Sequence, residues 1–274
     1  MPAALSDAAL QVSTEQAAFF HREGYLTLGA LTTPDELAWL REVYDRLFRE
    51  QVGRKEGAHL DLAGTDEDGQ QAALPQIMNP ARFVPELEHT QYRKNALAVA
   101  RQLFGPSARY RGEHMIYKPP HHGAATPWHQ DQAYHHPGFV YRQVNVWMPL
   151  QEATVENGCM QYVPRSHEGF GVLPHHHIGH DPRIHGLEVD APERCFERVV
   201  ACPVPAGGAA LHHSYLLHYA GPNRSPVPRR AYILTFALEP EPRAAPLEMP
   251  WQQESKTARQ QREKAFREQA ESKA

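Results

Sequence analysis

The chain has 274 residues, 28 lysine and arginine residues against 32 acidic ones, a formal net charge of −4 and 41% hydrophobic residues. These values are typical of one large globular domain, and the near-neutral charge without a basic cluster argues against nucleic-acid binding. No apolar run approaches the ~18–20 residues that span a membrane. The first twenty residues lack the cationic start and apolar core of a secretory signal, so we expect a cytoplasmic protein without membrane partners.

The N-terminal part of the chain predicts helices with one short strand. Helix caps, amphipathic spacing and a Gly/Asp-rich stretch set the boundaries. The predicted elements are a helix over 14–21, a strand over 24–28, a helix from Thr33 to about Glu50, a loop over 53–75 and a helix over about 92–104.

From residue 112 the pattern changes to short β-branched and aromatic runs separated by Pro and Gly. Val144, Val146 and Met148 alternate with Asn145 and Trp147, which is the period of a strand. Similar runs cover 113–118, 142–150, 158–164, 196–204, 209–219 and 230–238. Several strands at this spacing predict an antiparallel sandwich or barrel.

Two segments fall outside this pattern. Residues 169–195 form a long insertion without periodicity, and loops of that length often act as lids or binding loops. The tail from about 251 is a charged helix former with little apolar face, which predicts a solvated appendage. We expect a single domain over 1–274, with helical decoration over about 14–105, a core over about 110–240 and a helical tail over about 250–274.

Histidine is over-represented, with 18 residues, of which 15 lie between His114 and His218. The three cysteines include no C-x2-C pair, which argues against a structural zinc site. His-x-acid spacing occurs at His21, His59 and His129. On a strand, residues i and i+2 point the same way, about 6–7 Å apart, and can hold one ion.

Only His129 and Asp131 lie in the strand-rich half, since His21 falls in a helix and His59 enters the polar loop. Two histidines and one carboxylate form the facial triad of non-haem Fe(II) oxygenases. The third ligand should come from a late strand, where His212, His213 and His218 are the candidates.

These residues stand in a longer pattern that resembles the phytanoyl-CoA dioxygenase (PhyH) family of Fe(II)/2-oxoglutarate-dependent oxygenases. The resemblance runs from about residue 15 to 240. The matching stretches are Tyr117-Lys-Pro-Pro120, Trp128-His-Gln-Asp131, Val146-Trp147, Glu156-Asn-Gly-Cys-Met160, Val163-Pro-Arg-Ser-His167, His218-x-x-Gly-Pro-Asn-Arg-Ser-x-x-Pro-Arg229, and, near the N-terminus, Phe20-His-Arg-Glu-Gly-Tyr25 with Thr33-Pro-Asp-Glu-Leu37.

The resemblance implies a mainly β fold with flanking α-helices, a double-stranded β-helix of the cupin-like jelly-roll type. It also implies that His129, Asp131 and His218 hold iron and that Arg229 anchors the distal carboxylate of 2-oxoglutarate. Guanidinium suits that role because it stays charged when buried and binds carboxylates through paired hydrogen bonds. Arg230 is the alternative, since a register shift of one residue exchanges the two faces.

Further roles follow from the same resemblance. Lys118, Gln130 and Trp147 match positions that line the cosubstrate pocket. Ala220 stands where some family members present a hydroxyl group to 2-oxoglutarate. Related halogenases replace the carboxylate by a small residue, so Asp131 argues against halogenation.

The sequence indicates the substrate-binding residues less specifically than the metal-binding ones. Tyr134, Phe139 and Tyr141 follow the metal pair and either form the wall of the substrate pocket or pack against the next strand. The stretches 132–142 and 169–195 are the expected specificity regions. His175-His-His177 is a second candidate metal cluster, although adjacent loop residues usually point apart.

The predicted activity is that of a dioxygenase using Fe(II), 2-oxoglutarate and O2, an oxidoreductase that hydroxylates an unactivated C–H bond of a small metabolite or natural-product intermediate and releases succinate and CO2. Alternatives are a non-catalytic metal-binding jelly roll, or the same iron site used for desaturation, epimerisation or cyclisation. The expected partner is a small-molecule substrate. The sequence does not specify the oligomeric state.

Overall fold

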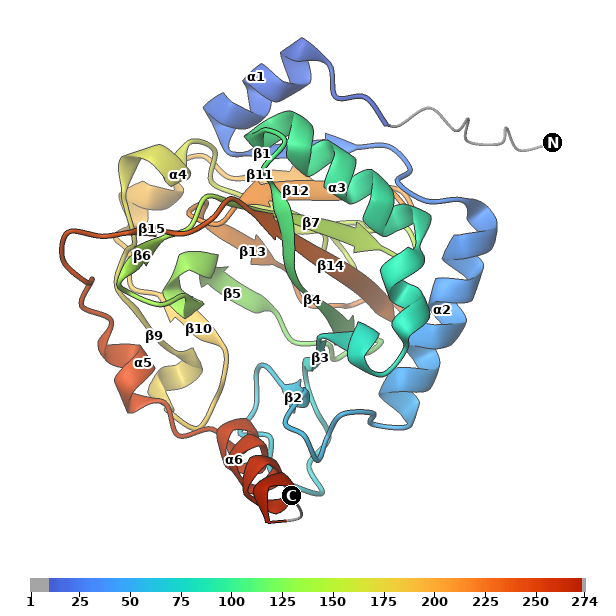
Figure 1. Cartoon of the computed structure of the whole chain (residues 1–274), viewed down its shortest axis with the longest axis vertical. Coiled ribbons are helices and arrows are strands. Elements are labelled where there is room, and N and C mark those ends of the chain that lie inside the picture. The colour runs from blue at the N-terminus through green and yellow to red at the C-terminus, as the bar shows by residue number, and fades with distance from the viewer. Residues whose placement is uncertain (1–9, 273–274) are drawn as a thin grey trace.

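The computed structural model describes residues 10–272 (Figure 1). Residues 1–9, which belong to the segment tested above for a secretory signal, lie outside the described residues. Within the described range, no helix has both the length and the apolar character that a membrane span requires.

Two antiparallel sheets form the core. The large sheet has the order β1 (Tyr25–Leu28), β12 (Ala209–His213), β7 (Gln143–Pro149), β14 (Arg229–Ala237), β4 (Arg109–Lys118), β3 (Pro75–Met78) and β2 (His59–Asp61). The small sheet has the order β11 (Val200–Cys202), β8 (Met160–Tyr162), β13 (His218–Ala220) and β5 (Thr126–His129). The predicted mainly β fold with flanking helices is confirmed.

Three helices cover the outer face of the large sheet (Figure 1). They are α1 (Thr14–Glu23), α2 (Pro34–Arg49) and α3 (Gln91–Phe104), and they agree with the predicted helices to within about two residues. Ser13 closes a capping box at α1, and the Thr33 side chain caps α2. Buried Val144, Val146 and Met148 of β7 pack in the same apolar core as these helices.

The alternation in β7 therefore separates two environments. Its Val and Met side chains face the helices, whereas Asn145 and Trp147 line a cavity between the two sheets. Strand periodicity thus places polar and aromatic side chains of a buried strand where a site can use them.

The prediction of one strand over 209–219 is wrong, because this segment forms two strands that belong to different sheets. β12 ends at His213 in the large sheet, and β13 begins at His218 in the small sheet. The Leu217 N–H donates to the Ser166 hydroxyl between them (2.8 Å), which satisfies the backbone where the chain changes sheet. Both halves are apolar and buried, so the pattern did not reveal the break.

The predicted loop over 53–75 contains β2 and the start of β3, so His59 and Asp61 lie on a strand after all. The Asp61 carboxylate accepts N–H groups from Ala63, Ala73 and Leu74 at 2.9–3.1 Å. This carboxylate therefore organises its loop.

The insertion over 169–195 also has structure. It contains the hairpin of β9 (His175–His177) and β10 (Leu187–Val189), preceded by α4 (Ser166–Gly169). A further two-stranded ladder joins β6 (Phe139–Val140) to β15 (Glu241–Pro242).

The expectation of a solvated tail is confirmed only in part. The tail forms two helices, α5 (Pro250–Glu254) and α6 (Ala258–Glu271); most of α6 is exposed, but α5 and the first turn of α6 are docked. Trp251 is buried and donates its indole N–H to the Ala133 carbonyl (2.9 Å). Arg262 forms an ion pair with the buried carboxylate of Asp66. A helix attached through such an ion pair shows no apolar face, so hydropathy could not reveal the docking.

Candidate active site

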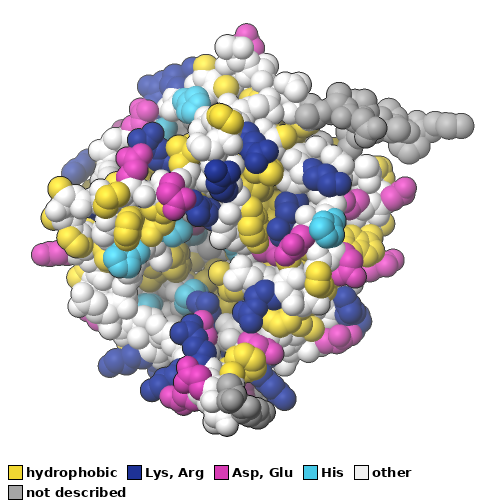
Figure 2. All heavy atoms as spheres, viewed as in Figure 1, with side chains coloured by type: hydrophobic (Ala, Val, Ile, Leu, Met, Phe, Trp, Pro, Cys, Tyr) yellow, Lys and Arg dark blue, Asp and Glu magenta, His cyan; other side chains and the backbone are white. Residues whose placement is uncertain are grey.

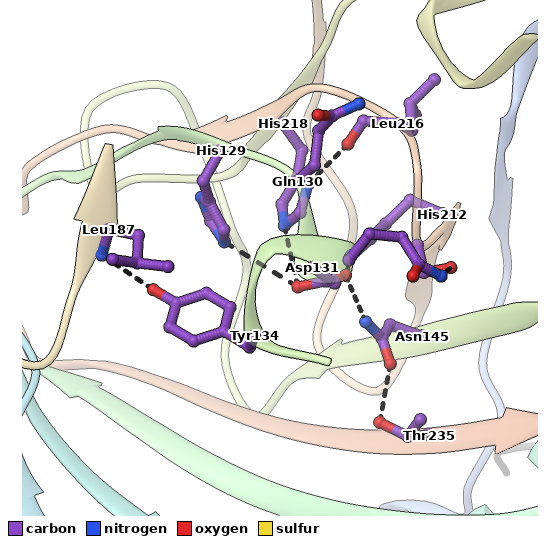
Figure 3. A network of polar contacts seen from close by, with 12 residues as sticks. His129, Gln130, Asp131, Tyr134, Asn145, Leu187, His212, Leu216, His218 and Thr235 are labelled. Carbon is purple, nitrogen blue, oxygen red and sulfur yellow. Dashed lines mark hydrogen bonds and ion pairs between the residues drawn. The ribbon is translucent and has the colours of Figure 1, made fainter. Parts of the chain in front are cut away.

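Two neighbouring strands of the small sheet bring three metal-binding side chains together. His129 at the end of β5 is the backbone partner of His218 at the start of β13. Asp131 follows in a single 3-10 turn, which directs its carboxylate back toward both rings (Figure 3). Its Oδ1 lies 3.8 Å from His129 Nε2 and 3.6 Å from His218 Nε2. Donor atoms of the three residues all lie within 4.8 Å of one another.

The two imidazole rings are oriented by backbone carbonyls. His129 Nδ1 lies 2.8 Å from Pro127 O, and His218 Nδ1 lies 2.8 Å from Leu216 O. Because a carbonyl only accepts, each Nδ1 carries the hydrogen and each Nε2 presents a lone pair toward Asp131. Burial lowers the pKa of His129, and lowers that of His218 well below its usual value, which keeps both rings neutral.

The carboxylate of Asp131 has one oxygen facing the rings and the other held from behind. Asn145 donates its amide to Oδ2 (2.5 Å), and His212 Nε2 lies 3.2 Å from the same oxygen. The Thr235 hydroxyl donates to Asn145 Oδ1 (2.6 Å), and the Tyr162 hydroxyl lies 3.2 Å from His212 Nδ1. Burial alone would raise the pKa of Asp131, but His218 and His212 together lower it below its usual range.

Two neutral nitrogen donors and one ionised carboxylate converge from one side on the same point. This is the donor set of a facial-triad iron site. Of the three late histidines, His218 joins this set and His212 orients Asp131 from behind. The residues missed from sequence are Asn145 and Tyr162, and a polar side chain in an otherwise apolar buried strand was the available signal for Asn145.

Arg229, at the start of β14, lies on the wall of the same cavity. It is 1% exposed, and its Nε and Nη1 atoms have no hydrogen-bond partner among residues 10–272. Its guanidinium carbon lies 5.3 Å from the centre of the Trp147 ring. Burial lowers the pKa of Arg229 to about 10, so it is still a cation at neutral pH. An unpaired buried cation is costly, which marks the position for an anion.

Arg230 faces the other side of the sheet. Its Nε and Nη2 atoms donate to the Asp45 carboxylate on α2, at 2.6 and 2.8 Å. The register thus leaves Arg229 as the cavity arginine.

The phytanoyl-CoA dioxygenase (PhyH) family model matches residues 20–231, which is most of the chain. The chain belongs to the PhyH family. The solved structure of EvdO2 from Micromonospora carbonacea var. aurantiaca is 37% identical with a TM-score of 0.74, covering 89% of this chain and 98% of that one. EvdO2 has also been solved with 2-oxoglutarate. EctD from S. alaskensis, at 22% identity and a TM-score of 0.65 over 86% and 80% of the two chains, shows the same fold.

Curated relatives are dioxygenases. A probable α-ketoglutarate-dependent hypophosphite dioxygenase of Stutzerimonas stutzeri is 26% identical over 60% of this chain and 57% of its own length. A probable phytanoyl-CoA dioxygenase of Caenorhabditis elegans is 25% identical over 82% of this chain and 75% of its own. The PhyH-family chain is therefore a 2-oxoglutarate-dependent oxygenase, with iron, 2-oxoglutarate and O2 as its cofactor and cosubstrates.

Trp147 lines the cavity of this PhyH-family oxygenase, but the structure places Gln130 elsewhere. Gln130 donates to the carbonyls of Gly171 and Tyr215 (2.8 and 2.7 Å) and accepts the Leu173 N–H. A residue between two neighbours that share a face points to the opposite side, so contact of Gln130 with 2-oxoglutarate is not supported.

Lys118 is fully buried beside Arg229, with which it is paired in register. Its ammonium donates to the carbonyls of Ala124 (2.6 Å) and Ala220 (3.1 Å) and is not part of the cavity lining. Burial, followed by the charge of Arg229, lowers the pKa of Lys118 well below its usual value. Its position fits a structural role at the back of the pocket rather than the predicted contact with 2-oxoglutarate.

Of the three aromatic residues after the metal pair, Tyr134 lines the cavity, and its hydroxyl accepts the Leu187 N–H (2.8 Å). Phe139 and Tyr141 lie outside the lining. The Tyr141 ring stacks on His135 at 4.5 Å, and Phe139 is exposed.

The cavity has a volume of about 460 Å³ and extends from the metal-binding residues to the surface. Figure 2 shows a hollow in this face of the molecule, with histidine and basic side chains at its lower edge. His175–His177 form no second metal cluster in the described part of the chain. His177 instead lies between the carbonyls of Ile184 and Trp251, and His175 Nε2 accepts the Gln130 N–H.

Proposed function

We propose that this PhyH-family oxygenase hydroxylates an unactivated C–H bond of a small-molecule metabolite or natural-product intermediate. His129, Asp131 and His218 hold the iron, and Arg229 pairs with the distal carboxylate of 2-oxoglutarate. The observation that carries the proposal is Arg229: a buried guanidinium without an anion, in the same cavity as the triad, has no role in a protein that only binds metal.

Iron held by these residues would supply the oxidative chemistry by which O2, 2-oxoglutarate and the substrate give CO2, succinate and the hydroxylated substrate. The chain's own residues orient and shield these reactants. Asn145 and His212 fix the Asp131 carboxylate, and the carbonyls of Pro127 and Leu216 fix the imidazole rings. The carboxylate of Asp131 also occupies the position that halogenating relatives keep free for halide, which favours hydroxylation over halogenation.

Cavity size and lining support a small substrate. A volume of about 460 Å³ falls within the ~300–1,000 Å³ of small-molecule pockets. Apolar Met160, Ile116 and Ile233 contribute to its walls beside the polar groups near the metal-binding residues. Such walls exclude water from the reacting carbon while leaving few fixed polar contacts.

The test is a metabolite screen with Fe(II), 2-oxoglutarate and 18O2, in which both succinate and the product are analysed by mass spectrometry. We expect one 18O atom in the new hydroxyl group of the product and one in succinate. A product that gains no oxygen would replace hydroxylation by desaturation or cyclisation if it has lost two hydrogens, and by epimerisation if its mass is unchanged. A protein that binds iron but neither binds nor consumes 2-oxoglutarate would be a metal-binding jelly roll.

A further inference from the structure

The outer end of the cavity contains an arginine that comes from the C-terminal tail. Arg259, in the first turn of α6, lines the cavity together with the triad, although 41 residues separate it from His218. Its Nε donates to the Gly57 carbonyl at 3.0 Å. Within residues 10–272, its two terminal nitrogens have no hydrogen-bond or ion-pair partner. Glu263, one helical turn further on, is near enough for its charge to favour the cationic form of Arg259, but its direct ion pair is with Arg267 (2.7 Å).

The position of Arg259 is fixed by its surroundings. The buried Asp66 carboxylate pairs with both Arg262 of α6 and Arg54. Gly57 has a φ of +71°, and a Cβ there would lie 2.9 Å from the Arg259 carbonyl oxygen. A close backbone contact and an ion pair thus seat the first turn of α6 against the loop before β2.

A row of rings connects Arg259 to the metal-binding residues. The His129 and Tyr134 ring centres lie 6.1 Å apart, and those of Tyr134 and His185 lie 5.8 Å apart. Burial, followed by the positive charge of Arg259, lowers the pKa of His185 to about 3. His185 is therefore neutral, and the positive charge at this end of the cavity belongs to Arg259.

The other charges of the cavity wall are compensated. Glu113 pairs with Arg93, and Arg111 pairs with Glu239, each at 2.5 Å. At the inner end, the positive charges of iron(II) and Arg229 would balance the negative charges of Asp131 and dianionic 2-oxoglutarate. Among the described residues that line the cavity, Arg259 is then a cation without a direct ion pair when the cofactor and the cosubstrate are bound.

We propose that Arg259 binds an oxyanion of the substrate, so that this enzyme acts on small molecules that carry a phosphate or carboxylate group. This inference rests on the proposed function, since it takes the cavity as the substrate site. The substrate then lies with its anion at Arg259 and its reacting carbon toward the triad, along Tyr134 and His185. Guanidinium suits both oxyanions through paired hydrogen bonds.

The test is anaerobic calorimetry on the Fe(II)- and 2-oxoglutarate-loaded protein with methylphosphonate, acetate and the neutral acetamide as probes. We expect at least one oxyanion to bind and acetamide not to bind. Arg259→Gln should weaken the bound oxyanion at least 10-fold, whereas Arg259→Lys, which keeps the charge but loses the paired hydrogen bonds, should weaken it less than Arg259→Gln does. Lys264→Gln, which removes an exposed charge from the same helix, should leave binding unchanged.

The affinity for 2-oxoglutarate and the melting temperature are measured for each protein. Oxyanion binding that is equal in wild type and Arg259→Gln, or absent from wild type, would overturn this inference while 2-oxoglutarate binding leaves the proposed function intact. Loss of 2-oxoglutarate binding from wild type would count against the proposed function instead. Tighter binding of methylphosphonate than acetate would indicate a phosphorylated substrate, and the reverse a carboxylated one.

Discussion

The two ends of the cavity are built in different ways. Backbone pairing places the inner end, since His129 opposes His218 and Arg229 opposes Lys118 in the sheets. The outer end is made by segments outside the two main sheets, and Arg259 reaches it because α6 is fastened through an ion pair at Asp66. Residues on rigid strands fix the geometry of the metal and cosubstrate site. Segments attached outside the strands can vary in sequence, and so alter substrate specificity, without disturbing that geometry.

The largest effect is expected from a substitution at the inner end of the cavity. Replacing Asp131 by Ala removes the only anionic ligand of the proposed triad, so iron affinity should fall by more than the about 10–100-fold typical of outer partners, and turnover should be lost. Iron titration and succinate formation measure this. Exposed His122→Gln is the matched control, and a variant at Asp131 that retains iron and activity would refute the assignment.

A second substitution tests the anion position at the same end. Arg229→Gln should weaken 2-oxoglutarate binding by about 100-fold, because a charge-assisted bond contributes about 1.5–3 kcal/mol. Calorimetry on the Fe(II)-loaded protein measures the change. Arg230→Gln is the control, because it removes the same charge from the neighbouring residue, whose side chain contacts Asp45 and not the cavity. This variant should bind 2-oxoglutarate with wild-type affinity. Equal weakening in both variants would contradict the assignment.

A smaller effect is expected behind the triad. Asn145→Ala leaves the three donors in place but removes the shorter of the two hydrogen bonds to the Asp131 oxygen that faces away from the rings. Iron affinity should fall by about 10–100-fold, as for other outer partners of metal ligands. Thr235→Val, one hydrogen bond further away, should have a weaker effect. An iron affinity unchanged by Asn145→Ala would show that the network does not position Asp131.

Acid should destabilise two segments that hold buried histidines. Burial lowers the pKa of His59 in β2 and of His175 in β9 to about 4, from an ordinary 6.5. The unfolded chain therefore binds more protons between these values, and stability falls as pH decreases from 6.5 toward 4. Each histidine should contribute up to about 1.4 kcal/mol per pH unit to this slope.

Denaturant unfolding across this pH range measures the slope. Replacing His59 by Gln should reduce it, and replacing exposed His89 by Gln should leave it in place. A His59→Gln variant with the wild-type slope would contradict the expected titration.

The contrast between the two ends also explains what the sequence could reveal. His129, Asp131 and Arg229 stand in local sequence motifs, and these motifs pointed to the inner end. The strand spacing expected for His129 and Asp131 is wrong in detail, because β5 ends at His129 and Asp131 lies in a 3-10 turn. Gln130 was misplaced although the same periodicity turns it away from its neighbours. Arg259 had no such signal, because its place depends on contacts of α6 with residues about 200 positions earlier, namely the ion pair of Arg262 with Asp66 and the backbone contact at Gly57.

The central claim is tested most directly by an anaerobic crystal structure with Fe(II) and 2-oxoglutarate, with diffraction measured at the iron absorption edge. We expect an anomalous peak bonded to His129 Nε2, Asp131 Oδ1 and His218 Nε2, with the distal carboxylate of 2-oxoglutarate on Arg229. Iron bound by other residues, or 2-oxoglutarate bound away from Arg229, would contradict the account.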